Sequence, residues 1–302
     1  MSVVVDAHQH FWSYGSYQTS WMEEQPYAGD REFEPLRRSF QPEDLIPELR
    51  AAGVHCTLTV EAADGLAEND ALLADAHAHS WIAGVVGWVP LAQPSEAERI
   101  LDSHAGEPAL VGIRHLINVE PDRDWIVRPD VLKGLQVLAA HNLTFDYVGI
   151  LPRHLEHVPL IAQRVPDLRI VIDHLGKPPI IAGQFEPWTS LLASAAKMPN
   201  VFAKISGLDC RADWRAVNIA PYIERALELF GAERLMFGSD WPVANIRGGY
   251  GKVWRETNLA LAHLSSDERD RILGGTAIEF YRLPTASLSR SGDDSTSLAT
   301  DS

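Results

Sequence analysis

Eight short apolar runs, rich in β-branched residues, constrain the fold of this chain more than any other feature. They occupy residues 3–8, 56–62, 82–89, 110–116, 143–149, 169–175, 201–207 and 234–241. Most are continuous apolar stretches without strict alternation, a pattern typical of parallel strands that are buried on both faces. The sequence therefore predicts a parallel sheet that is covered by helices.

Segments with helical signals separate these runs. Residues 42–53, for example, carry Pro42 near the first helical position and Gly53 where a helix would stop. Strand and helix alternate about eight times, which predicts an α/β fold, a (β/α)8 barrel of the TIM type that forms a single domain over residues 1–283. A doubly wound sheet is the alternative, but it would carry a glycine-rich turn where this sequence reads DAHQHFW. Residues 284–302 are small and polar, and we expect them to form a disordered tail.

The connection after the first run is unusually long and aromatic. Residues 11–40 contain Trp12, Tyr14, Tyr17, Trp21, Tyr27 and Phe33. Loops that follow the strands of a barrel lie at its C-terminal mouth, where active sites are found. We therefore expect a distorted barrel with this long first loop over the mouth.

Composition excludes several classes of partner. The chain has 26 basic and 41 acidic residues, a net charge of −15, which argues against binding to nucleic acid or to an anionic membrane. Its two cysteines, Cys56 and Cys210, provide no disulfide framework. Asp6 interrupts the first apolar run, and no stretch approaches the ~20 apolar residues of a membrane span. We expect a cytoplasmic monomer or homodimer that acts on a small molecule.

Polar residues stand at the ends of the predicted strands. His8 and His10 are two residues apart, so both imidazoles project from the same face of the first strand. Because the carboxyl ends of parallel barrel strands meet at one mouth, polar groups from different strands are expected to converge there. The others are Arg114 and His115, Asp146, Asp173 and His174, Lys204 and Ser206, and Asp240.

Five stretches, DAHQHFW, GIRH, DHLGKP, AKISGL and FGSDWPV, are spread over residues 6–243. Together they resemble the amidohydrolase superfamily and, within it, the sugar-lactonase branch. The resemblance implies that His8 and His10 form the first-strand pair, that His174 is the sixth-strand histidine, and that Asp240 is the general base. The bridging lysine of two-metal members is absent at the intermediate strands, and Lys204 is on the seventh. A two-metal site is therefore not expected.

Three functions are compatible with this pattern. The first is a lactonase that opens a sugar-acid lactone, with Asp240 activating a water and His8, His10 and His174 polarising the carbonyl. It requires no cofactor, although the same four residues could bind one Zn²⁺. The second is a zinc-dependent decarboxylase of an unsaturated or aromatic acid on the same barrel. The third is a non-catalytic barrel that binds a sugar acid.

Other side chains are candidates for substrate binding. Polar candidates are Arg114, His115, Asp146 and Lys204, and candidates for an apolar face against a sugar ring are Trp12, Trp88 and Trp241. Adjacent residues of a regular strand point to opposite faces, so only one of Arg114 and His115 is expected to face the substrate. By the same rule, Asp173 is expected to point away from His174.

Overall fold

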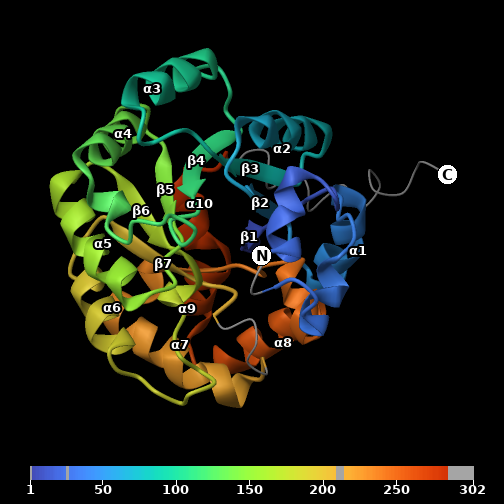
Figure 1. The fold of residues 1–302 in the computed structure, drawn as a ribbon. Helices are drawn as coiled ribbons and strands as arrows, with labels where there is room; N and C mark the ends of the chain where they lie inside the picture. Colours follow the sequence, from blue (N-terminus) through green and yellow to red (C-terminus); the bar gives the residue numbers. More distant parts are fainter. Residues whose placement is uncertain (1, 25–26, 209–213, 285–302) are drawn as a thin grey trace.

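The computed structural model describes residues 2–24, 27–208 and 214–284. Eight strands form one sheet in chain order (Figure 1). They are β1 (Val5–Gln9), β2 (Cys56–Val60), β3 (Ile82–Gly87), β4 (Leu110–His115), β5 (Thr144–Tyr147), β6 (Arg169–Ile172), β7 (Val201–Ile205) and β8 (Leu235–Phe237). Neighbouring strands pair in parallel from β1 through β8, and each strand overlaps one of the eight predicted runs.

The backbone also closes the sheet between its two ends. Just beyond β8, the amide of Asp240 donates to the carbonyl of His8 at 2.8 Å, and the amide of His10 donates to the carbonyl of Trp241 at 2.7 Å. Gln9 and Trp241 form the corresponding parallel bridge. The predicted (β/α)8 barrel is therefore confirmed.

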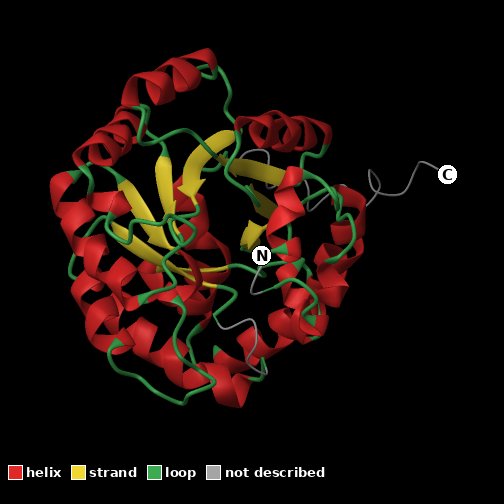
Figure 2. Ribbon diagram, viewed as in Figure 1, coloured by secondary structure: helices red, strands yellow, loops and turns green. Residues whose placement is uncertain are grey.

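Helices surround the strands, all but the last as an outer ring (Figure 2). They are α1 (Pro42–Ala52), α2 (Leu66–Ala78), α3 (Pro94–Ser103), α4 (Pro129–Ala140), α5 (Pro152–Arg164), α6 (Trp188–Ala196), α7 (Ala216–Phe230), α8 (Tyr250–Ala260), α9 (Ser266–Asp270) and α10 (Thr276–Tyr281). The first begins at Pro42, as predicted, and ends before Gly53, whose φ of 69° lies in the left-handed region that favours glycine. Among the described residues, none of these helices is long and apolar enough to cross a membrane.

A register shift in β1 turns the histidines toward the barrel interior. The pairing of β1 with β2 shifts between Asp6 and Gln9. Before the shift, Val5 and Ala7 pack in the apolar cluster inside the barrel. An irregularity of this kind changes which face successive side chains occupy, so His8 can follow Ala7 on the same interior side.

The last helix closes the N-terminal end of the barrel. Phe280 of α10 is 1% exposed and packs on Phe202 of β7, with ring centroids 4.7 Å apart. Arg169, at the start of β6, donates a hydrogen bond to the carbonyl of Phe280. In Figure 1, α10 crosses the centre of the ring of strands. The C-terminal helix is therefore part of the barrel core.

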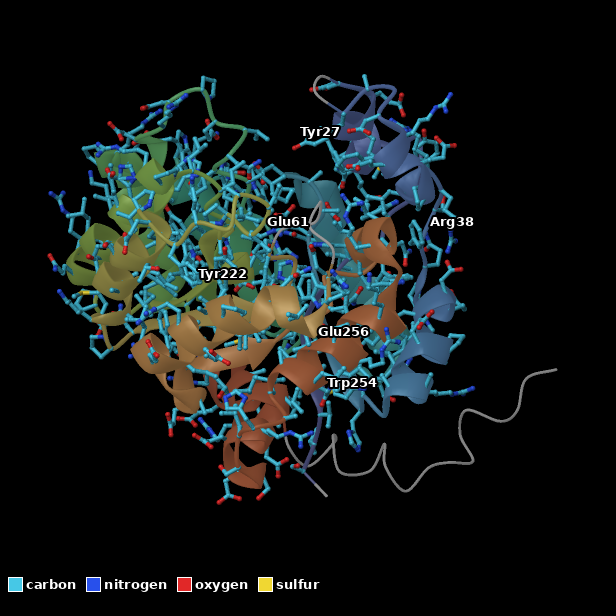
Figure 3. All side chains as sticks on the ribbon, turned by 90° about the horizontal axis from the view of Figure 1, so that it is seen from below. Tyr27, Arg38, Glu61, Tyr222, Trp254 and Glu256 are labelled. Atoms are coloured by element: carbon cyan, nitrogen blue, oxygen red, sulfur yellow. The ribbon has the colours of Figure 1, made fainter. Side chains whose placement is uncertain are left out.

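The long connection between β1 and α1 forms an aromatic layer. It contains two short 3-10 helices, Tyr17–Glu23 and Arg31–Leu36. Trp12 packs edge-on against Phe40, and Phe40 against Trp241, with ring centroids 5.4 and 5.2 Å apart. Figure 3 shows Tyr27 at the outer end of this segment. The tail predicted for residues 284–302 lies, apart from residue 284, outside the described residues.

We predict that Phe280→Ala lowers the free energy of unfolding by about 3–5 kcal/mol, because it removes a buried ring and leaves a cavity at the closed end. Chemical denaturation measures the change. Leu259→Ala is the control, because Leu259 is 56% exposed on α8 and its truncation should change stability by less than about 0.5 kcal/mol. Equal, small losses for both variants would contradict the role assigned to α10.

Candidate active site

A cavity of about 240 Å³ opens at the C-terminal ends of the strands. Its polar lining comes from His10, Arg114, Asn118, His174, Lys177 and Asp240. The rest is mainly aromatic or aliphatic: Trp12, Trp21, Tyr27, Ala62, Leu116, Val119, Val148, Ile150 and Val243. A concave site with a few converging polar groups in an apolar wall is typical of a site for a small molecule.

The residues at positions 8, 10, 174 and 240 come together at one end of this cavity. His10, His174 and Asp240 line it, and His8 lies against them without being a lining residue. Oδ1 of Asp240 lies 3.7 Å from Nε2 of His8 and 3.6 Å from Nε2 of His10. The ring centroid of His8 is 4.7 Å from that of His174. All four side chains are buried. The polar residues that follow the first, sixth and eighth strands therefore lie close together, as expected for the C-terminal mouth of a barrel.

Unusual backbone conformations orient two of these groups. His174 and Asp240 both have a φ of 57°, in the left-handed region that few residues other than glycine adopt. His174 lies in a 3-10 turn, Asp173–Gly176, that follows β6 directly. Residues held in such conformations cluster at functional sites, because the surrounding structure must stabilise them.

The same turn corrects one expectation from the sequence. Asp173 does not point away from the site: its Oδ1 lies 3.3 Å from Nδ1 of His8 and 3.1 Å from Nζ of Lys204. The prediction was wrong because the strand ends at Ile172, so the alternation of a regular strand no longer applies at positions 173 and 174.

Hydrogen bonds fix the ring orientation of the histidines. Nδ1 of His10 donates to the carbonyl of Val60 at 2.8 Å, which turns Nε2 of the ring toward Asp240. Nδ1 of His174 lies 2.9 Å from Oγ of Ser206. Nδ1 of His8 lies 3.0 Å from the amino group of Lys204. Each imidazole is thus held from behind by a partner on another strand.

Burial and neighbouring charges determine the ionisation of the site. Burial alone would raise the pKa of Asp240, but His174, His10 and Lys177 together hold that pKa below its usual value. Burial lowers the pKa of His174 to about 3, and it lowers that of His8 well below the ordinary value. At neutral pH the site therefore contains an ionised carboxylate beside neutral His8 and His174.

Asp146 and Lys204 lie beneath the cavity. Lys204 contacts Asp146 and Asp173 in ion pairs, and the hydroxyl of Tyr281 donates to Oδ2 of Asp146 at 2.7 Å. All of these side chains are buried, and neither Asp146 nor Lys204 is among the cavity-lining residues. These contacts indicate that Asp146 and Lys204 support His8 from below. They do not favour the contact with substrate that we expected from the sequence.

The structure distinguishes Arg114 from His115. Arg114 lines the cavity, and its Nε donates to Oε1 of Glu61 at 2.8 Å. Glu61 is buried, and Figure 3 shows it nearer the middle of the molecule than Tyr27. This burial raises the pKa of Glu61 to about 8, although the positive charge of Arg114 opposes the shift. His115 instead stacks on Trp125, with ring centroids 4.1 Å apart, and its Nε2 lies 2.7 Å from Oε1 of Glu120.

The three tryptophans proposed as sugar platforms occupy different places. Trp12 lines the cavity. The indole of Trp88 donates to Nδ1 of His115 at 3.1 Å, and Trp241 packs against Phe11 and Phe40, so neither is among the cavity-lining residues. Of the three, only the position of Trp12 supports contact with a substrate.

Lys177 is a cavity residue that the sequence reasoning did not select. Its amino group donates to the carbonyl of Gly207 at 2.6 Å, and its φ of 56° continues the left-handed turn after His174. The signal was present, because Lys177 belongs to the DHLGKP stretch. Trp21 and Tyr27 were noted as aromatic residues of the long loop, and Asn118 carried no signal.

The donor set fits a single divalent metal ion. His8, His10 and Asp240 each offer one atom within 4.8 Å of the others, and Nε2 of His8 has no hydrogen-bond partner among the described residues. Imidazole and carboxylate are suitable ligands for zinc, and the bond from His10 to Val60 leaves its Nε2 free to coordinate. Within the described part of the chain, His174 instead joins His8 and Asp173 in a second, overlapping group.

Comparison with known proteins agrees with this geometry. The family model described as amidohydrolase matches residues 5–283. An L-fucono-1,5-lactonase of Burkholderia ambifaria is 37% identical over 290 residues, which cover 94% of this chain and 97% of that protein. An L-fucono-1,5-lactonase of Burkholderia multivorans is 33% identical over 299 residues, covering 93% and 96%.

A solved structure extends the agreement to the fold. The crystal structure of an amidohydrolase from Burkholderia multivorans with bound zinc is 33% identical, with a TM-score of 0.84, and the match covers 94% of this chain and all of that chain. The resemblance stated from the sequence is confirmed. Because the family model spans nearly the whole barrel, this chain belongs to the amidohydrolase family.

Proposed function

We propose that this protein is a lactonase that opens the ring of a sugar-acid lactone, with L-fucono-1,5-lactone as the first substrate to test. The observation that carries the proposal is the ionised Asp240 carboxylate beside buried imidazoles in a small cavity. Two curated relatives above 30% identity carry the L-fucono-1,5-lactonase name, which supports the same substrate class.

The charges and tautomers support a division of roles. Asp240 is the base that takes a proton from the attacking water, because its lowered pKa keeps it ionised. Nδ1 of His8 lies 3.0 Å from the amino group of Lys204 and 3.3 Å from Oδ1 of Asp173, and we propose that it accepts from Lys204, so that the proton of neutral His8 is on Nε2, on the side of Asp240. His8 can then donate to the carbonyl oxygen of the lactone as negative charge develops there.

The bond from Nδ1 of His10 to the carbonyl of Val60 orients this ring, so that its Nε2 lies 3.6 Å from Oδ1 of Asp240. Arg114 and Lys177 line the same cavity and bring positive charge close to the developing oxyanion and to the carboxylate of the product. The ring oxygen leaves as an alkoxide, and protonated Asp240 returns the proton to it.

A bound zinc ion would be held by His8, His10 and Asp240. It would supply Lewis-acid polarisation and a water with a pKa of about 7. We propose that lactone opening does not strictly require this ion, since the chain itself provides an ionised base and charged groups. No observation of this site specifically favours the decarboxylase or the non-catalytic alternative. A cytoplasmic location and a monomeric or homodimeric state also stay predictions.

We predict that Asp240→Asn lowers kcat by about 10²–10⁴-fold, because the amide cannot accept the proton of the water. A pH-indicator assay of lactone opening measures the rate, and circular dichroism checks that the fold is unchanged. Asp70→Asn, at an exposed position of α2, is the matched control and should keep the rate of the unmodified protein. A near-normal rate for Asp240→Asn would remove Asp240 from the role of base.

We predict that protein stripped of metal by a chelator keeps most of its lactone-opening activity. The base and the charged groups of the cavity belong to the chain, so the reaction retains a route without the ion. The assay is run on samples whose metal content is measured in parallel. Activity that rises and falls in proportion to bound zinc would show that the metal is required.

We predict that kcat stays flat between about pH 5 and pH 7. The depressed pKa of Asp240 keeps the base ionised throughout this interval, and His174, with a pKa of about 3, stays neutral. The acid limb of the profile therefore falls below the interval. A rate profile with an inflection near the ordinary histidine value of about 6.5 would contradict this ionisation state.

A further inference from the structure

A second, much smaller hollow adjoins the cavity just described. Its volume is about 10 Å³, and it shares Asp240 and Val243 with the larger cavity. Its lining consists of Gly207, Trp214, Ser239, Asp240, Val243, Ala244, Arg247 and Val253. A hollow of roughly this volume holds one water molecule when polar partners are present.

Trp214 provides an unused donor in the wall of this hollow. Its side chain is buried, with 3% exposed, and its indole Nε1 has no hydrogen-bond partner among the described residues. A buried indole N–H normally finds a partner, because leaving it unpaired costs the hydrogen bond it made to water in the unfolded chain. A water in the hollow would satisfy this group.

The two oxygens of Asp240 face different surroundings. Oδ1 is the atom nearest to His8 and His10. Oδ2 lies against Gly207, where a Cβ would come within 2.7 Å of the Asp240 Cγ and 2.8 Å of the His174 Nδ1. Only a glycine fits this closely against Oδ2, and both Gly207 and Asp240 line the small hollow. Oδ1 is thus the oxygen next to the histidines, and Oδ2 is the oxygen next to Gly207.

We propose that this hollow binds the hydrolytic water, which accepts a hydrogen bond from Nε1 of Trp214 and donates one to Oδ2 of Asp240. This inference rests on the lactonase function proposed above. A site that is separate from the larger cavity keeps the water next to its base while a lactone fills that cavity. Trp214 is then a positioning residue, since it acts through the water and the carboxylate.

The step balances with the groups present. The water oxygen bonds to the lactone carbonyl carbon while one of its protons moves to Oδ2 of Asp240. The bond between that carbon and the ring oxygen then breaks, and the same proton moves from Asp240 to the departing oxygen. The product is the open hydroxy acid, and Asp240 returns to its ionised form. A new water from solvent refills the hollow.

Trp214→Phe tests the proposal, because it removes the N–H and keeps most of the ring volume. We expect kcat for lactone opening to fall about tenfold, the effect of one lost hydrogen bond to the reacting water, while KM stays within about twofold. Ala244→Val, which narrows the hollow from another side, should give the same pattern. Trp254→Phe is the matched control, because Trp254 packs on Phe237 away from the hollow and should keep the normal kcat.

A high-resolution crystal structure of the unmodified protein gives a readout independent of turnover. We expect an ordered water within hydrogen-bond distance of both the Trp214 Nε1 and the Asp240 Oδ2, and its loss in Trp214→Phe. Unchanged kcat in Trp214→Phe, or a hollow without water, would overturn the proposal. If the unmodified protein opens no lactone but the water is present, the proposed function fails and the one-water site stands.

Discussion

The seam between β1 and β8 is the constraint on which the site depends. Two backbone hydrogen bonds, from Asp240 to His8 and from His10 to Trp241, join the first and last strands. They close the barrel, and they also hold Asp240 beside His8 and His10, although more than two hundred residues separate Asp240 from these histidines in the chain. Closure of the fold and assembly of the site are thus linked, because His8, His10 and Asp240 take part in both.

Beneath the seam, the barrel holds charged groups that an ordinary core would exclude. Lys204, Asp146 and Asp173 are fully buried, and Lys204 forms an ion pair with each of the two carboxylates. Buried ion pairs contribute little net stability, because desolvation offsets most of their attraction, but removing one partner is strongly destabilising. Their position under His8 favours a role in holding that ring, and the apolar cluster around α10 supports them from below.

The sequence was sufficient to predict the barrel, the long aromatic loop and the four residues that meet at the cavity. Periodicity and strand ends carry that information, because every parallel strand of a barrel points the same way. Prediction from the sequence failed where the backbone departs from regular strand geometry. The left-handed turn at His174 brings Asp173 inward, and strand alternation cannot foresee this. The sequence also did not show which residue each side chain contacts. His115 stacks on Trp125, ten positions away along the chain.

The residue types predict which chemical groups the site contains, but they do not predict the hydrogen-bond partner of each histidine ring. Nδ1 of His10 bonds to a backbone carbonyl, whereas Nδ1 of His8 faces Lys204 and Asp173, and Nδ1 of His174 lies against Ser206. Three histidines that look equivalent in the sequence are therefore distinct in the site. Such differences arise from neighbours that lie far away in the chain, so only the folded arrangement reveals them.

The most direct test of the central claim is the rate at which the purified, unmodified protein opens sugar-acid lactones, starting with L-fucono-1,5-lactone. We expect acceleration of at least one such lactone by about 10⁶-fold or more over the uncatalysed rate, as is typical of enzymes. A folded protein that accelerates no member of a broad lactone panel would contradict the assignment.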